Sequence, residues 1–156
     1  MLKRLLHTFV FAVFAVVTVV ALSPLGFADE LNLAAYKGKV VYIDFWASWC
    51  GPCRQSFPWM KELQAAKSKD GLVIIAVNVD QEKKLADAFL AEFSPNFKIV
   101  FDPEGKLATE FKVAGMPSAY IIGRDGKPRV KHIGYHHEKR SQYEQEIQTL
   151  LDEATH

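Results

Sequence analysis

The segment Asp44-Phe45-Trp46-Ala47-Ser48-Trp49-Cys50-Gly51-Pro52-Cys53 decides the fold of this chain. Before it, Val40 to Trp46 is rich in β-branched and aromatic residues, which predicts a strand buried on both faces. After it, apolar residues recur at helical spacing from Phe57 onward. The two cysteines therefore lie at a strand-to-helix junction.

The spacing of the cysteines indicates redox chemistry. They are the chain's two cysteines, and a bond between them would close almost no loop, so it would stabilise the fold little. A helix N-terminus favours the reactive thiolate, so we expect Cys50 to have an exposed sulfur with a lowered pKa. Cys53, one turn later, is expected to be more buried and to resolve a mixed disulfide on Cys50. Pro52 fits the first helical turn, which needs no N–H from it.

The rest of the chain alternates strands and helices. This predicts an α/β domain with a mixed sheet, parallel except for a late antiparallel hairpin, and helices on both faces. We expect Leu85, Phe89 and Phe93 to share the buried face of the helix 83–93, and Pro128 to begin an edge strand. The predicted elements after the first strand are the helix that carries Phe57, Met60, Leu63 and Ala66; strands at 72–79, 99–101, 118–122 and 128–133; a short helix around 107–111; and a terminal helix with Tyr143, Ile147, Leu150 and Leu151.

The N-terminal segment 1–28 has the pattern of a secretion signal. Lys3 and Arg4 precede an almost wholly apolar run, and Gly26-Phe27-Ala28 places small residues before a possible cleavage site. The apolar run, residues 9–22, is shorter than the ~20 residues that span a bilayer core. We expect cleavage, with a retained inner-membrane anchor as the alternative, and residues 29–156 as one domain in the periplasm. The membrane would then be contacted only through residues 1–28, if they are uncleaved.

Charge argues against nucleic acid as a partner. Without Lys3 and Arg4, 17 of the 19 basic residues remain against 18 acidic ones, so no basic field is expected. A zinc site using Cys50, Cys53, His132 and His136 is a weaker alternative, because the histidines are too far along the chain for a zinc finger. No metal or cofactor is expected, and His132, His136 and His137 are predicted to be solvated surface residues.

The active-site segment resembles that of thioredoxin. Pro58 resembles the family's helix proline, and Met116-Pro117 resembles its cis-proline element. The segments 83–113, Ala119 to Gly126 and Gly134-Tyr135 resemble the periplasmic TlpA/ResA-like branch. Nearly all of the chain after residue 28 is covered. The resemblance implies a thioredoxin fold and a protein-disulfide oxidoreductase.

The resemblance also assigns roles to residues. Cys50 would attack, Cys53 would resolve, and Asp44 would be a buried carboxyl that relays the proton, a role that a raised pKa suits. Trp49 would pack beside the dithiol, although plain core filling would also explain it. Pro117 would be cis and, with Met116, would present backbone to a substrate chain that also meets Gly51 and Pro52.

One departure from the branch concerns the third position after the second cysteine. Branch members often carry Glu there, and this chain has Ser56, which leaves acid–base chemistry to Asp44 and weakens any link to apocytochrome clients.

The direction of exchange is predicted from the dipeptide between the cysteines. Gly51-Pro52 is that of thioredoxin, whose potential is about −270 mV, far below the roughly −120 mV of the oxidant DsbA. We therefore expect reduction of disulfides in exported proteins, with re-reduction by a membrane electron donor, since the chain has no nicotinamide or flavin motif. An oxidase or isomerase on the same fold, and a client- or metal-binding chaperone without turnover, remain alternatives.

Overall fold

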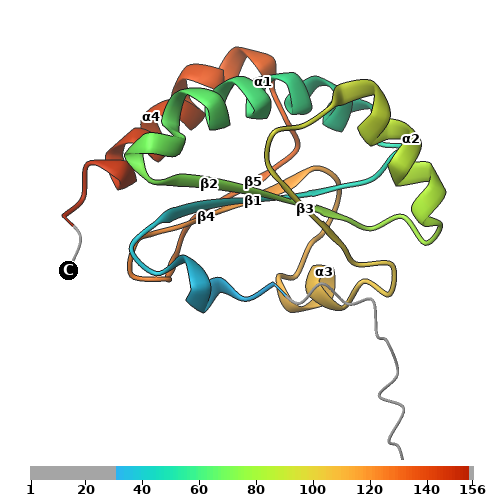
Figure 1. The fold of residues 1–156 in the computed structure, drawn as a ribbon, viewed down its shortest axis with the longest axis horizontal. Helices are drawn as coiled ribbons and strands as arrows, with labels where there is room; N and C mark the ends of the chain where they lie inside the picture. The colour runs from blue at the N-terminus through green and yellow to red at the C-terminus, as the bar shows by residue number, and fades with distance from the viewer. Residues whose placement is uncertain (1–30, 155–156) are drawn as a thin grey trace, which may run out of the picture.

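The computed structural model describes residues 31–154, which form one α/β unit (Figure 1). The predicted elements are all present, with ends that differ by a few residues at most. In chain order they are β1 (Val40–Trp46), α1 (Gly51–Lys67), β2 (Leu72–Asn78), α2 (Lys83–Phe93), β3 (Lys98–Phe101), α3 (Lys106–Glu110), β4 (Ser118–Ile122), β5 (Pro128–Ile133) and α4 (Arg140–Leu151), with short 3-10 helices at Leu33–Tyr36, Ser68–Asp70 and His137–Lys139.

The sheet is mixed, as predicted. Its strand order is β3-β2-β1-β4-β5, with β1, β2 and β3 parallel, and with β4 antiparallel to both β1 and β5. All seven residues of β1 are buried, because β1 is the central strand and both its faces are covered. Pro128 begins the edge strand β5, where its missing N–H removes no central ladder bond.

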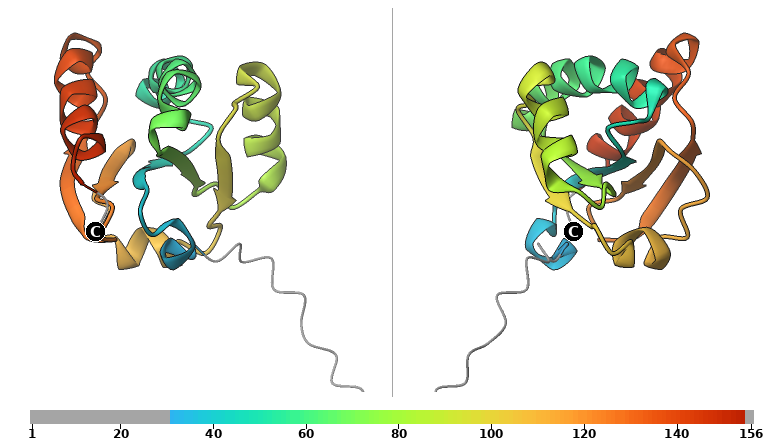
Figure 2. Two further views of the ribbon diagram at one scale, coloured as in Figure 1. Left: turned by 60° about the vertical axis from the view of Figure 1, so that its left-hand side comes forward. Right: turned by 90° about the vertical axis from the view of Figure 1, so that its right-hand side faces the viewer.

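Helices cover both faces of the sheet. In Figures 1 and 2, α1, α2 and α4 lie over one face, while α3 and the 3-10 helix Leu33–Tyr36 lie under the other. Side chains alternate along β1: Val40, Tyr42 and Trp46 join the core beneath α1, and Val41, Ile43 and Phe45 join the core above α3. By the same alternation, the Asp44 side chain points to the α1 face.

The helix α2 has one residue of its predicted buried face in a different place. Leu85 is 45% exposed, so its predicted place on the buried face is wrong. Ala86 and Phe89 face the core, and the Phe89 ring packs against Trp46 and Phe57 with ring centres 4.6 and 4.8 Å apart. Phe89 and the partly buried Phe93 lie on the core face as predicted, so the prediction for α2 is wrong only at Leu85.

Arg124 ties together three segments at the end of the sheet away from the cysteines. Its Nη1 donates to the carbonyl of Gly38 at 2.7 Å. Its Nη2 donates to the carbonyls of Asp70 at 3.1 Å and Leu151 at 2.7 Å. One guanidinium thus joins the turn before β1, the end of the 3-10 helix after α1, and the end of α4.

Candidate active site

The two cysteines form a disulfide at the start of α1. Cys50 is the N-cap residue, and its Sγ accepts a hydrogen bond from the Cys53 backbone N–H at 3.2 Å. The expected exposed sulfur is not found, because Cys50 as a whole is only 3% exposed. Cys53 is fully buried, so Cys50 is still the more accessible of the two. A thiolate on Cys50 would lie against the unpaired N–H groups of the helix, which stabilise negative charge.

A tight turn presents Trp49 beside the disulfide. The Cys50 N–H donates to the Ala47 carbonyl at 3.1 Å, which closes the turn 47–50 directly after β1. Trp49, the third residue of this turn, is 71% exposed, so the interpretation that it only fills the core is wrong. An exposed indole next to the cysteines gives an apolar surface against which another protein chain can pack.

Asp44 is buried beneath α1, on the same face of the sheet as the cysteines. It is 2% exposed, and its Oδ2 has no hydrogen-bond partner. Burial raises its pKa well above the ordinary carboxyl value, because desolvation disfavours the charged form. Its cross-strand neighbours are the small residues Ala76 on β2 and Ala119 on β4. A raised pKa makes the carboxylate a stronger base than an ordinary one, which suits the predicted role of exchanging a proton with Cys53.

Pro117 lies at the same end of the sheet as the cysteines. The Met116-Pro117 peptide bond is cis, as predicted, and β4 begins at the next residue, Ser118. Ser118 pairs with Phe45 near the end of β1, from which the turn 47–50 departs. The Pro117 carbonyl accepts a hydrogen bond from the Gly134 N–H at 2.8 Å, which brings the chain after β5 to this edge as well.

The side chains just after Cys53 place no free charge beside the disulfide. Ser56 is buried, and its hydroxyl donates to the Cys53 carbonyl at 3.1 Å. The Arg54 guanidinium pairs with Glu92 and lies 5.0 Å from the Phe93 ring centre. Its positive charge is thus balanced by a carboxylate on α2. Gly51 opens the helix with free space around its Cα, so the backbone next to Cys50 is unobstructed.

The residues considered for zinc are not gathered by the fold. Both cysteines are in the disulfide, and His132 Nε2 lies 2.6 Å from Glu146 Oε2. Within residues 31–154, no three His, Cys, Asp or Glu side chains are placed to hold a metal ion. His132 was predicted to be solvated, which is wrong, since it is partly buried against the Tyr143 ring; His136 and His137 are exposed as predicted.

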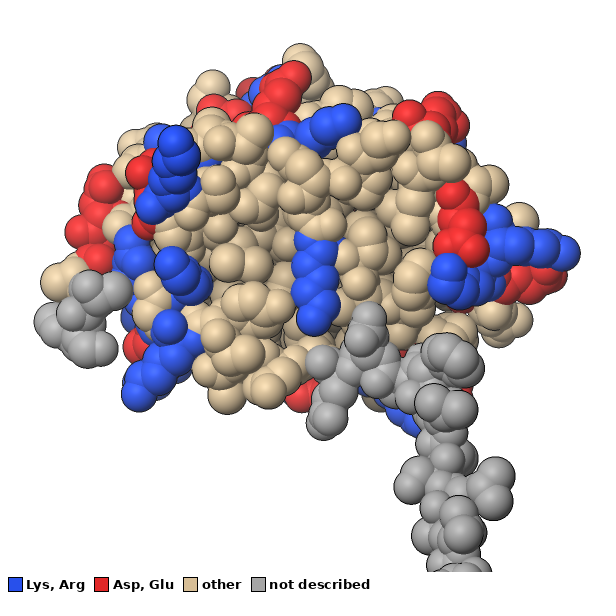
Figure 3. All heavy atoms as spheres, viewed as in Figure 1, with Lys and Arg blue, Asp and Glu red and all other residues tan. Residues whose placement is uncertain are grey.

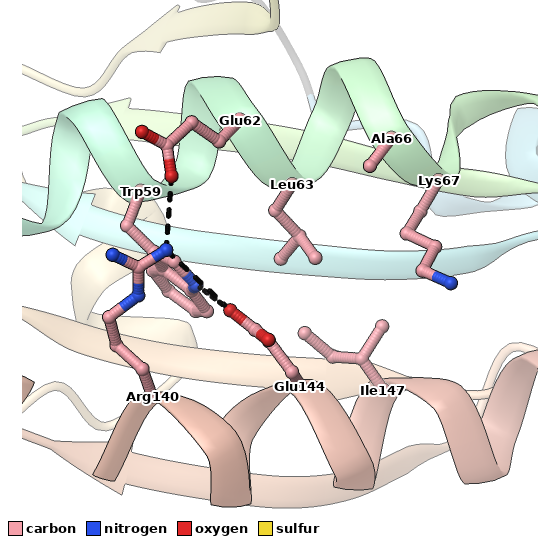
Figure 4. Close-up of a pocket in the computed structure, with 8 residues that line it drawn as sticks. All are labelled: Trp59, Glu62, Leu63, Ala66, Lys67, Arg140, Glu144 and Ile147. Atoms are coloured by element: carbon pink, nitrogen blue, oxygen red, sulfur yellow. Dashed lines mark hydrogen bonds and ion pairs between the residues drawn. The ribbon is translucent and has the colours of Figure 1, made fainter. Parts of the chain in front are cut away.

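A separate hollow of about 230 Å³ lies between α1 and α4 (Figure 4). Arg140 crosses one end of it, between Glu62 at 3.0 Å and Glu144 at 3.8 Å, and Glu144 also accepts from the Trp59 indole N–H at 2.8 Å. Leu63, Ala66, Lys67 and Ile147 complete the lining. Neither cysteine lines this hollow, so the chemistry of the disulfide does not extend into it.

Sequence reasoning did not single out Asp80 as a residue of the site. Asp80 is 4% exposed and its carboxylate holds Ser48, two residues before Cys50. The available signal was its position after a buried parallel strand. Polar residues at the carboxyl ends of such strands meet at one edge of the sheet.

Comparison with known proteins assigns the family. The Redoxin family pattern matches residues 27–150. The chain belongs to the Redoxin family. A solved structure from Chlorobium tepidum, provisionally described as the thiol:disulfide interchange protein DsbE, is 44% identical with a TM-score of 0.75, covering 76% of this chain and 84% of that one. This Redoxin chain therefore has the thioredoxin-like fold that the active-site segment predicted.

Two sequence relatives are thiol–disulfide proteins by name. The thiol-disulfide oxidoreductase ResA of Geobacillus kaustophilus is 36% identical over 104 residues, and the thiol:disulfide interchange protein CycY of Rhizobium leguminosarum is 42% identical over 106 residues. Each alignment covers 67% of this chain. The chain spans only 59% of the ResA length and 55% of the CycY length.

Proposed function

We propose that this protein is an exported thiol–disulfide oxidoreductase that reduces disulfides in periplasmic proteins through Cys50 and Cys53. The observation that carries the proposal is the Cys50–Cys53 disulfide at the first turn of α1, in a chain with no other cysteine. A pair that forms a disulfide at a helix N-terminus can alternate between dithiol and disulfide. The buried Asp44 beneath it supplies a carboxyl for proton transfer.

The proposed reaction has two displacements. The Cys50 thiolate attacks one sulfur of a client disulfide, forming a mixed disulfide and releasing the first client thiolate. The Cys53 thiol then loses its proton to the Asp44 carboxylate and attacks the Cys50 sulfur, releasing the second client thiolate. The client gains two electrons and the enzyme dithiol becomes a disulfide. The client chain would pack on Trp49 and meet Gly51, Pro52, Met116 and Pro117.

The proposed direction is reductive. Gly51-Pro52 adds no positive charge between the cysteines, and Arg54 is balanced by Glu92. A Cys50 thiolate stabilised mainly by helix-end N–H groups leaves the reduced form less stable than in a strong oxidant. Because the periplasm is kept oxidising, the proposed enzyme needs a membrane electron donor to return it to the dithiol.

Export rests on the sequence of residues 1–28, which lie outside the described part of the chain. We propose that this segment directs the protein to the periplasm, where it is cleaved or kept as an inner-membrane anchor. No helix within residues 31–154 is long and apolar enough to cross a membrane. On the face in Figure 3, acidic and basic side chains lie intermixed, so this face has no continuous basic field to attract nucleic acid.

The test of function is insulin reduction with dithiothreitol as the electron source, against the matched variant Cys50→Ser. The wild type should accelerate precipitation of the insulin B chain and the variant should not. Equal rates would identify a binding module without turnover. Equilibration with glutathione then gives the potential. A value above about −180 mV, the level of protein disulfide isomerase, would replace the reductase proposal with an oxidase or isomerase. Trapping clients with Cys53→Ala would identify the substrates.

A further inference from the structure

Asp80 is a buried aspartate outside the dithiol, and both of its carboxylate oxygens accept hydrogen bonds from the active-site turn. The Asp80 Oδ2 accepts hydrogen bonds from the Ser48 N–H at 2.9 Å and from Asn78 Nδ2 at 2.8 Å. Its Oδ1 accepts one from the Ser48 hydroxyl at 2.9 Å. The Asp80 N–H donates in turn to Asn78 Oδ1 at 3.1 Å. A carboxylate that is 4% exposed is thus paired at both oxygens, as a buried charge must be.

These bonds continue the pairing of β1 and β2 beyond the ladder. Trp46 and Asn78 are the last paired residues, and the Val79 N–H donates to the Trp46 carbonyl at 3.0 Å. The Asp80 side chain then reaches Ser48, the second residue of the turn 47–50. The chain after β2 therefore holds the chain after β1, up to two residues before Cys50.

We propose that Asp80 is a positioning residue for exchange at Cys50, acting through Ser48. Cys50 is the last residue of the turn and the N-cap of α1, so the backbone of the turn sets where its sulfur lies relative to the helix N–H groups. Ser48 is fixed by Asp80 through both its N–H and its hydroxyl. Without the carboxylate both groups lose their partner and the turn can relax. Disulfide exchange requires alignment of sulfurs, and a misplacement of about 1 Å can slow a reaction roughly a hundredfold.

Asp102 offers a matched control. It is also an aspartate that directly follows a parallel strand, and it is 5% exposed. Its carboxylate accepts the Ala108 N–H at 2.9 Å and so anchors α3, on the face of the sheet away from the cysteines. Replacing it removes a buried, hydrogen-bonded carboxylate of similar exposure without touching Ser48.

The inference rests on the proposed exchange activity, and the experiment uses four variants: Asp80→Ala, Asp80→Asn, Ser48→Ala and Asp102→Ala. For each reduced protein we would measure the rate of exchange with oxidised glutathione, the rate of insulin reduction and the rate of Cys50 alkylation by iodoacetamide. Measurements are made where near-ultraviolet circular dichroism shows every variant to be folded. The glutathione reaction needs no client surface, and the alkylation needs no exchange activity.

Asp80→Ala should slow all three reactions by about tenfold or more. Ser48→Ala should slow them less, because the Ser48 N–H keeps its bond to Asp80. Asp80→Asn should recover most of the rate, since an amide oxygen can accept the Ser48 N–H and the amide nitrogen can donate to the Ser48 hydroxyl. Asp102→Ala should react like the wild type.

Four results would overturn the inference: wild-type rates in Asp80→Ala, an equal loss in Asp102→Ala, no recovery in Asp80→Asn, or a loss on insulin alone. No recovery in Asp80→Asn would assign the effect to the charge of Asp80. A loss on insulin alone would assign it to client contact by Trp49. Failure of the proposed function is visible separately as a wild type no faster on insulin than Cys50→Ser. The alkylation rates then still decide whether Asp80 positions Cys50.

Discussion

Replacing Asp44 with alanine should make the protein more stable at neutral pH while slowing disulfide exchange. The carboxyl is buried, one of its oxygens has no partner, and burial raises its pKa. Leaving a buried acceptor unpaired costs about 1–3 kcal/mol, and more when it is charged. The variant removes that cost.

The size of the gain follows from two opposing contributions. Alanine at position 44 leaves a void the size of a carboxyl group, on the order of 40 Å³, which at about 24 cal/mol per Å³ costs about 1 kcal/mol. Its strand neighbours Ala76 and Ala119 are too small to fill the void. Setting this against the unpaired acceptor, we expect a net rise in the free energy of unfolding of up to about 2 kcal/mol at pH 7.

The pH dependence of the stability difference tests this prediction more specifically than its size at pH 7. In the unfolded chain the carboxyl titrates near pH 4, and in the folded protein it titrates higher because its pKa is raised. Between the two values the folded state binds more protons, so the wild type loses stability as pH rises, by up to about 1.4 kcal/mol per pH unit. Above the folded pKa the full penalty is present, and below pH 4 it is absent. The advantage of the variant should therefore grow from pH 4 upward and then level off.

The assay is urea unfolding of the oxidised proteins from pH 4 to pH 9, with Asp102→Ala as the control. Asp102 is buried but accepts a hydrogen bond, so its removal should destabilise the protein. A lower stability of Asp44→Ala than of wild type at pH 7, or a difference that does not change with pH, would refute the reasoning. Stopped-flow release of a mixed disulfide on Cys50 should be slower in the variant at neutral pH. Unchanged release would show that Asp44 is not the proton relay.

The remaining predictions concern the thiols, the exposed indole and the guanidinium bridge. In the reduced protein, Cys50 should be alkylated faster than the fully buried Cys53, with an apparent pKa below the free-cysteine value of about 8.5; a faster Cys53 in a pH–alkylation profile would reverse their roles. Trp49→Ala should change stability by less than about 0.5 kcal/mol and slow insulin reduction several-fold while leaving glutathione exchange intact, and equal losses on both disulfides would show that Trp49 does not contact clients. Arg124→Ala should lower the free energy of unfolding by about 2–4 kcal/mol, because three carbonyls lose a charged donor, and urea unfolding beside an unchanged exchange rate checks that this bridge is structural.

The sequence predicted the strands well because their burial leaves a direct mark on composition. β1 is buried at every position and all its residues except Asp44 are β-branched or aromatic, and the edge strand is marked by Pro128. The buried face of α2 was harder to predict. Its buried face includes Ala86, whose small side chain scarcely enters a hydrophobic pattern, whereas Leu85 fits the helical spacing of Phe89 and is exposed.

The candidate site likewise combines residues that the local sequence predicts with contacts that only the folded chain brings together. Cys50, Cys53 and Asp44 are set by local spacing and by the strand that carries them, so their placement at one helix end and under it could be predicted. The Ser48–Asp80 contact joins residues 32 apart in sequence, and it exists only because β1 and β2 are parallel neighbours whose ends meet. Arg54 likewise pairs with Glu92 across 38 residues, which no local pattern indicates. The local motif thus predicts which atoms can react, while the pairing of the strands and helices determines how rigidly those atoms are held. For this reason the rate of exchange should respond to Asp80, a residue that no sequence motif of the active site includes.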